Sequence, residues 1–177
     1  TLDEAESAKY LNSADSFLYH KSNSVYGMER AKEAIRKENA VLVVEGYMDT
    51  LMLRQAGFAH TVAPLGTALT EGHVRLLMRF TRNIILVFDG DEAGGKATAR
   101  ALPLFLEMGL MPRVVVLPED EDPDSFVRNA GPEAFAAELQ KARSLFEYFI
   151  DWTLMKTGFD AVGSSEATKQ ILPWLKK

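Results

Sequence analysis

The sequence predicts an α/β fold in which a parallel sheet is covered by helices on both faces. From Val41 onward, short apolar runs alternate with segments of helical periodicity. The apolar runs are nearly continuous, as expected for strands that are buried on both faces of a sheet. Acidic residues follow three of these runs. They should therefore lie at the carboxyl edge of the sheet, where open α/β sheets bind their ligands.

These patterns locate four strands and the helices between them. Strands are predicted at residues 41–44, 60–64, 83–88 and 113–118. Helices are predicted at 47–57 with Gly57 as the stop signal, from Thr70 as N-cap to Phe80, and from about Lys96 to Met108 with Gly109 closing the helix. Pro123 favours one more helix start, over the segment DSFVRNAG.

The two flanks differ from this alternating centre. Residues 1–38 contain a polar stretch with little periodicity, followed by a helix over ERAKEAIRKE. Residues 131–177 read as three helices, over PEAFAAELQKA, SLFEYFIDWTLMKTG and SSEATKQILPWLKK. The chain therefore has one central α/β unit with a short leading segment and a helical extension.

Composition narrows the class of protein. The chain has 177 residues, no cysteine and a net charge of −5. It shows no secretory signal and no apolar stretch near the roughly 20 residues that span a bilayer, so we expect a cytoplasmic protein without membrane partners. The negative charge has the wrong sign for holding nucleic acid by phosphate neutralisation alone. The basic residues of a groove that binds nucleic acid would therefore have to come from elsewhere.

Three acidic motifs follow the first, third and fourth predicted strands. They are EGYMD with Glu45 and Asp49, DGDEAG with Asp89 and Asp91, and PEDEDPD with Asp122 and Asp124. Carboxylates crowded at one sheet edge repel each other, and a cation relieves this repulsion. Mg²⁺ prefers hard oxygen ligands and keeps waters for phosphate substrates. The pattern therefore favours a divalent-metal site and phosphoryl or nucleotidyl chemistry.

Each motif also has a simpler interpretation. Glu45 could serve only to interact with the positive N-terminal end of the helix that follows it. Asp91 could serve only as the N-cap of the helix that follows the DGD motif. PEDEDPD could be a solvated acidic turn. Helix capping leaves Asp89 without a role, however, and the repetition of acidic motifs at one edge favours the metal site over these readings.

Other candidate sites carry less weight. Gly66 and Thr67, in the LGT turn after the second strand, could meet a phosphate or template backbone, and an ordinary turn is an equal alternative. The segment at 90–97 comes close to a phosphate-binding loop, but Ala97 stands where a hydroxyl must bind Mg²⁺, so we reject that reading. The three histidines, His20, His60 and His73, lack metal-ligand spacing, and surface or packing roles are expected.

Six phrases, in this order, resemble the bacterial DnaG-type primases. They are KYLNS (9–13), HKSNSVYG (20–27), VVEGYMD (43–49), APLGTALT (63–70), FDGDEAGGKA (88–97) and LPEDEDPDSFVR (117–128). The acidic motifs resemble the Toprim domain that primases share with topoisomerases. The resemblance implies a Toprim domain at 39–128, between the end of an N-terminal core subdomain at 1–38 and the start of a C-terminal helical subdomain at 129–177.

The resemblance also implies an activity. The chain would be a fragment of a nucleotidyltransferase that makes short RNA primers for DNA replication, from ribonucleoside triphosphates on a single-stranded DNA template. Its implied catalytic residues are Glu45, Asp49, Asp89 and Asp91, and the implied ligands of Mg²⁺ or Mn²⁺ are Glu45, Asp89, Asp91, Asp122 and Asp124. Glu45 could instead assist deprotonation of the attacking hydroxyl. Lys9, Asn12 and Lys21 would bind nucleotide and template beside Gly66 and Thr67.

The chain resembles only part of such a primase. Nothing in it is similar to the zinc-binding module, to the first half of the polymerase core or to the region that binds the replicative helicase. We therefore expect weak or no primer synthesis by this fragment alone. Two alternatives stay open, a Toprim nuclease or topoisomerase module and a non-catalytic regulatory α/β domain that binds metal.

Overall fold

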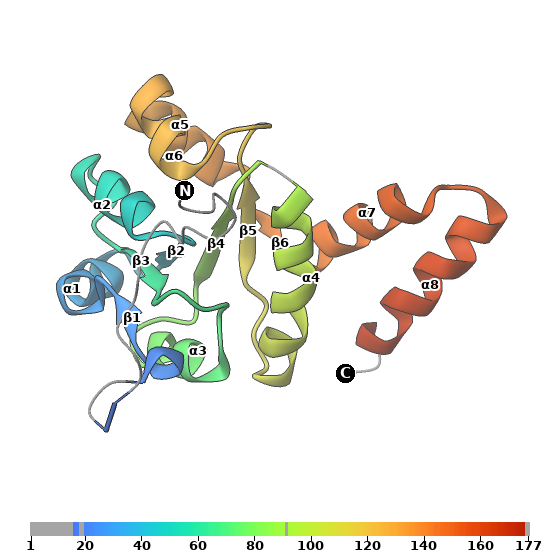
Figure 1. Cartoon of the computed structure of the whole chain (residues 1–177), viewed down its shortest axis with the longest axis horizontal. Helices are drawn as coiled ribbons and strands as arrows, with labels where there is room; N and C mark the ends of the chain where they lie inside the picture. The colour runs from blue at the N-terminus through green and yellow to red at the C-terminus, as the bar shows by residue number, and fades with distance from the viewer. Residues whose placement is uncertain (1–15, 18–19, 91, 176–177) are drawn as a thin grey trace, which may run out of the picture.

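The computed structural model describes residues 16–175 except 18, 19 and 91, and for residues 92–95 it describes the backbone alone. Its centre is a six-stranded sheet in the order β1-β3-β2-β4-β5-β6. The inner strands β3 (Thr61–Pro64), β2 (Val41–Val43), β4 (Ile84–Phe88) and β5 (Arg113–Val116) are parallel. This confirms the predicted parallel sheet with helices around it (Figure 1).

Two short edge strands were not predicted. The strands β1 (Val25–Tyr26) and β6 (Arg143–Ser144) pair antiparallel with β3 and β5, respectively. Two residues are too few to produce a periodic pattern, so their pairing depends on the neighbouring strand rather than on local sequence. The described sheet is therefore mixed, with a parallel centre and antiparallel edges.

The helices follow the predicted alternation closely. A 3₁₀ turn, η1 (Lys21–Asn23), precedes β1, and the α-helices are α1 (Met28–Glu38), α2 (Tyr47–Gln55), α3 (Glu71–Met78), α4 (Glu92–Glu107), α5 (Pro123–Ala130), α6 (Pro132–Gln140), α7 (Leu145–Thr157) and α8 (Ala161–Leu175). Thr70 caps α3 as predicted, and Pro123 is the first residue of α5. The helix α4 begins at Glu92, about one turn before the predicted start at Lys96, so Gly94 and Gly95 belong to its first turn.

Alternate residues of each inner strand face opposite layers of the core. Val41 and Val43 pack in a cluster with residues of α1, α3, α4 and α7. Leu42 and Val44 pack in a second cluster with residues of α2, α5 and α6. The sheet is thus covered on both faces, while α7 and α8 extend to one side as a packed pair (Figure 1). None of the described helices is long and apolar enough to cross a membrane.

The topology places a switch point beside β2. The chain leaves β2 for β3 on one side, and then crosses to β4 on the other side of β2. The carboxyl ends of β2 and β4 therefore open onto a crevice from which the following helices diverge, the usual ligand position in such sheets.

Candidate metal and nucleotide site

Five predicted acidic residues line one pocket at the carboxyl edge of the sheet. The pocket has a volume of about 280 Å³ and is lined by Glu45, Asp49, Asp89, Asp122 and Asp124, together with Gly46, Tyr47 and Met48. Glu45 follows β2, Asp89 follows β4, and the loop after β5 carries Asp122. Because these three strands are adjacent and parallel, residues that follow them meet at one edge.

Gly90 allows two of the acidic loops to approach each other closely. A Cβ atom on this residue would lie 1.8 Å from the carbonyl oxygen of Pro118, in the loop after β5. Only glycine fits such a backbone contact. The glycine of the DGD motif is therefore required by packing, and it brings Asp89 toward the PEDEDPD loop.

Asp49 is half-buried, and its carboxylate accepts backbone hydrogen bonds. It accepts a hydrogen bond from the Gly46 N–H, 2.9 Å away, which fixes the turn into α2. Burial raises the pKa of Asp49; backbone hydrogen bonds from Gly46 and Asp124 oppose the shift, and the charges of Asp122 and Asp124 add to it. Asp49 thus links the starts of α2 and α5.

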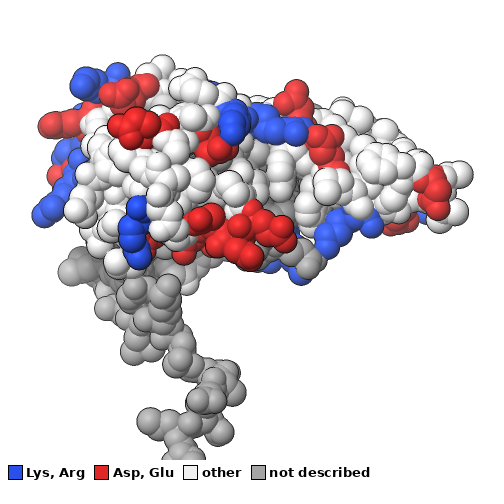
Figure 2. Space-filling view, turned by 90° about the horizontal axis from the view of Figure 1, so that it is seen from above, with Lys and Arg blue, Asp and Glu red and all other residues white. Residues whose placement is uncertain are grey.

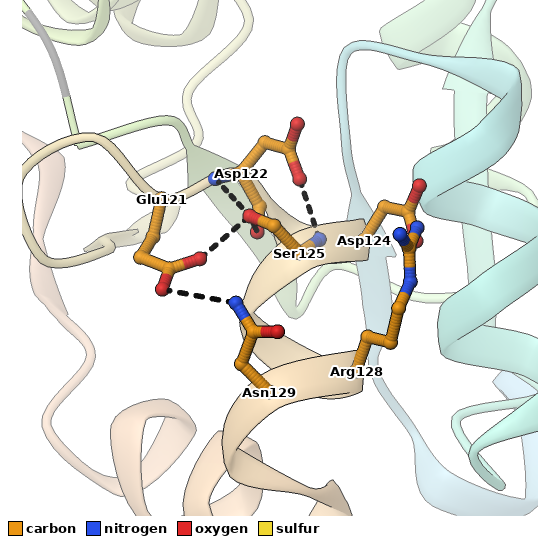
Figure 3. A network of polar contacts seen from close by, with 6 residues as sticks. All are labelled: Glu121, Asp122, Asp124, Ser125, Arg128 and Asn129. Carbon is orange, nitrogen blue, oxygen red and sulfur yellow. Dashed lines mark hydrogen bonds and ion pairs between the residues drawn. The ribbon is translucent and has the colours of Figure 1, made fainter.

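Asp122 caps the helix α5. Its Oδ1 accepts the N–H of Ser125 at 2.6 Å, and the Ser125 hydroxyl in turn accepts the N–H of Asp122 at 3.0 Å. The same hydroxyl lies 2.6 Å from Oε2 of Glu121, to which it can donate, and Asn129 donates to the other oxygen of Glu121 (Figure 3). Glu121 and Asp122 in the second half of PEDEDPD are therefore held by hydrogen bonds, whereas Pro118, Glu119 and Asp120 are exposed to solvent.

Asp124 faces the pocket from the first turn of α5. It forms an ion pair with Arg128, one helical turn later, and its side chain is only 17% exposed (Figure 3). The pairing, through a hydrogen bond and the opposite charge, raises the pKa of Arg128. One acidic member of the pocket thus already has a cationic partner.

The donor set fits a hard divalent cation, although the acidic side chains are not gathered around one point. Among the residues that the structure describes, no three acidic or histidine side chains are arranged to hold one metal ion. Asp91, the second aspartate of DGD, lies outside the described residues. The chemistry still favours a cation, since all five groups are carboxylates and the charges of Asp122 and Asp124 disfavour ionisation of Asp49. Figure 2 shows acidic side chains gathered near the middle of this side of the molecule.

A second, larger pocket adjoins the acidic one and shares Glu45 with it. Its volume is about 420 Å³, and Gly66 and Thr67 line it as part of the loop between β3 and α3. Its other walls are largely apolar, and α4 contributes Arg100 at its rim. The turn predicted to meet phosphate therefore lies beside the predicted metal ligands.

The remaining predicted binding residues divide into two groups. Lys21 belongs to η1, which packs on the start of α3 through the hydrogen bond between the Lys21 carbonyl and His73. Lys9 and Asn12 lie outside the described residues. Gly66 and Thr67 thus lie in a pocket beside the acidic one, with which it shares Glu45. The backbone of Lys21 is held at the end of the same β3–α3 loop where α3 begins.

Comparison with known proteins gives a consistent assignment. A family model described as Toprim-like matches residues 42–127. DNA primases of Aquifex aeolicus and Pasteurella multocida are each 42% identical to this chain, over 87% and 97% of its length. A crystal structure of a DNA primase domain from Pseudomonas aeruginosa superimposes with a TM-score of 0.86 and 38% identity, covering 97% of this chain and 55% of that one. The chain belongs to the DnaG-type primase family.

The match to the primases covers only part of their length. The chain spans 30% of each of these two full-length relatives. Another solved structure, a DnaG primase catalytic domain bound to single-stranded DNA, gives a TM-score of 0.84 at 36% identity and covers 97% of this chain and 56% of that one. The chain therefore corresponds to a portion of a primase catalytic core.

Two residues of this primase portion were missed by sequence reasoning. Tyr47 lines the acidic pocket and packs against Tyr26 of β1, with ring centroids 4.8 Å apart. Arg100 lines the second pocket from the same face of α4 as Ala97 and Ala101. The i, i+3, i+4 spacing of these three α4 residues is the signal that could have identified Arg100.

Proposed function

We propose that this chain forms the metal-binding part of a primase catalytic core, which joins ribonucleoside triphosphates into a short RNA primer on a single-stranded DNA template. The observation that carries the proposal is the pocket in which three adjacent parallel strands deliver five carboxylates. Membership of the primase family, and relatives whose solved structures contain single-stranded or double-stranded DNA, support it.

In this proposal the carboxylates hold Mg²⁺ or Mn²⁺. Glu45, Asp89 and Asp91 would be the principal ligands, with Asp122 and Asp124 beside them and Asp49 holding the loops together. When bound, the metal would orient the primer hydroxyl and the incoming triphosphate and stabilise charge on the attacking and leaving oxygens. The Toprim domain would occupy residues 39–128, between the end of the N-terminal core subdomain at 1–38 and the start of the helical subdomain at 129–177.

The neighbouring residues would bind the substrates. The Gly66–Thr67 turn would offer the Thr67 hydroxyl to phosphate oxygens, while the Gly66 N–H donates to the Pro64 carbonyl and holds the turn. Lys21, Lys9 and Asn12 would contact nucleotide and template. The replicative helicase would bind through a region outside these 177 residues, and a cytoplasmic location would suit a protein of DNA replication. The relatives reported above are primases, which favours primer synthesis over the topoisomerase and regulatory alternatives.

Calorimetric titration with Mg²⁺ and Mn²⁺ tests the metal site. The parent chain should bind the metal, and the double variant Asp89→Asn plus Asp91→Asn should lose most of the affinity. Glu147→Gln, which removes an exposed carboxylate on α7, serves as the control and should bind metal like the parent. Equal affinity in the parent and the double variant would show that the acidic pocket is not a metal site.

A further inference from the structure

His73 uses both of its ring nitrogens to join two segments of the chain. It lies in the first turn of α3 and is fully buried. Its Nδ1 accepts the N–H of Thr70 at 3.1 Å, so Nδ1 carries no proton. Nε2 therefore carries the proton and donates it to the carbonyl oxygen of Lys21, 2.6 Å away and 52 residues earlier in the sequence.

Two neighbours of His73 hold the same segment. The hydroxyl of Thr70 donates to the carbonyl oxygen of Ser22. Gly72 lies so close to η1 that a Cβ atom on it would be 2.0 Å from Oδ1 of Asn23 and 2.6 Å from the Ser22 carbonyl oxygen. The start of α3 is thus shaped to hold the backbone of η1 in one position.

This junction connects two groups of predicted nucleotide-binding residues. On one side it holds the backbone of Lys21. On the other side Thr70 ends the β3–α3 loop, whose residues Gly66 and Thr67 line the larger pocket together with Glu45. A shift of η1 against α3 would therefore move Lys21 relative to the phosphate-binding turn.

We propose that His73 is a positioning residue for nucleotide binding. It fixes Lys21 against the β3–α3 loop, so that the lysine ammonium and the Gly66–Thr67 turn meet the same triphosphate. The inference rests on the proposed function, because it assigns Lys21 and the turn to a nucleotide. It differs from a helix-capping role in one respect: capping uses Nδ1 alone, whereas positioning requires Nε2 and its bond to Lys21.

Variants at the junction separate the two roles. His73→Leu removes both hydrogen bonds, and His73→Asn keeps an acceptor for Thr70 but is too short to reach the Lys21 carbonyl. Gly72→Ala improves the helix propensity of α3 by about 1 kcal/mol, while its methyl group displaces η1. Thr81→Val is the matched control, since Thr81 is buried and bonded to Asn39 next to the opposite end of β4.

The measurement is the binding of a fluorescent ribonucleoside triphosphate to the chain in the presence of Mg²⁺, with unfolding by urea measured in parallel. His73→Leu, His73→Asn and Gly72→Ala should each weaken nucleotide binding about fivefold to tenfold, the size expected for a lost hydrogen-bonded contact. None of them should weaken it further when Lys21→Ala is already present. Thr81→Val should lower stability and leave nucleotide affinity unchanged.

Several results would overturn the inference. If His73→Asn binds nucleotide like the parent, capping is the role of the ring. If the effects of His73→Leu and Lys21→Ala simply add, or if Lys21→Ala has no effect, His73 does not act through Lys21. Mg²⁺ titration without nucleotide distinguishes the two proposals: a parent that binds metal but no nucleotide refutes the positioning role alone, whereas a parent that binds neither refutes the proposed function as well.

Discussion

Gly90 donates its backbone N–H to the carbonyl oxygen of Glu121, 3.0 Å away, and so joins the turn after β4 to the loop before α5. Asp89 directly precedes this bond on one side, and Asp122 directly follows it on the other. The hydrogen bond from the Leu117 N–H to the Phe88 carbonyl, 3.2 Å long, brings the same two strands together at their ends. The relative position of Asp89 and Asp122 thus depends on a close contact between two backbones.

Replacement of Gly90 by alanine should disturb this contact. The added methyl group would lie 1.8 Å from the Pro118 carbonyl oxygen, so the two loops must separate. We expect a loss of about 2–3 kcal/mol in the free energy of unfolding, as for other overpacked sites, together with weaker Mg²⁺ binding. Urea denaturation and calorimetry measure the two effects.

A second glycine variant provides the comparison for Gly90→Ala. At Gly57 an added methyl group meets no atom within 4 Å, although φ is +102°. Gly57→Ala should therefore lose about 1 kcal/mol from backbone strain alone and bind Mg²⁺ like the parent. Unchanged stability and metal affinity in Gly90→Ala would contradict the role assigned to the loop contact.

The stability of the protein should depend on the protonation of His60. Burial lowers the pKa of His60 below its ordinary value of 6.5, and the charge of Glu38 opposes this only in part. The unfolded chain therefore binds a proton more readily than the folded protein, so His60 makes folding less favourable as pH falls through 6.5 toward the lower folded value. His60→Gln should remove this component.

The test for His60 is the free energy of unfolding of the parent and of His60→Gln between about pH 5 and pH 8, a range that covers the ordinary histidine pKa. The difference between the two proteins should shift in favour of the variant as pH falls. Parallel curves across the whole range would show that the environment of His60 does not disfavour its charged form.

The central fold could be predicted because each inner strand is a continuous apolar run. Residues 84–88 are buried throughout, so the strand reads clearly from sequence. The antiparallel pairing of Val25 with Pro64, in contrast, depends on a contact across the chain that local sequence does not encode. The same limit explains the missed junction at His73, whose partner Lys21 lies 52 residues away.

The candidate site was predicted in composition but not in detail. Because they follow parallel strands, Glu45, Asp89 and Asp122 were predicted to lie at the carboxyl edge of the sheet. In the structure all three line one pocket. The sequence predicted the helix start at Pro123, but not that Oδ1 of Asp122 accepts the N–H of Ser125, because a carboxylate beside a helix start can face either the helix or the pocket. Whether a carboxylate oxygen accepts a structural hydrogen bond or faces the pocket depends on the folded geometry and not on the residue type alone.

Asp122 has two roles that substitution can separate. Its carboxylate caps α5, and in the proposed function it also contributes to the metal site. Asp122→Ser keeps a good N-cap and removes the charge, whereas Asp122→Ala removes both. We expect Asp122→Ala to lose about 1 kcal/mol of stability by the capping estimate, and Asp122→Ser to lose little.

Metal binding supplies the second readout for Asp122. Both variants should weaken Mg²⁺ binding in calorimetric titration to a similar degree, because both lack the carboxylate. If Asp122→Ser binds Mg²⁺ like the parent, Asp122 is a helix cap and nothing more, and the metal ligands must be sought among the other residues of the pocket.

Primer synthesis by this chain alone should be weak or absent, even though it should bind metal. Lysine and arginine number 20 against 25 aspartate and glutamate residues, so little positive charge is available to hold a template by phosphate neutralisation. The assay is incorporation of labelled ribonucleotides on single-stranded DNA with Mg²⁺ or Mn²⁺, beside the Asp89→Asn plus Asp91→Asn double variant as the blank. Product at the level of the blank is expected, while calorimetry still detects bound metal in the parent. Robust template-dependent synthesis that the double variant abolishes would show that these 177 residues suffice to hold the template as well as the metal.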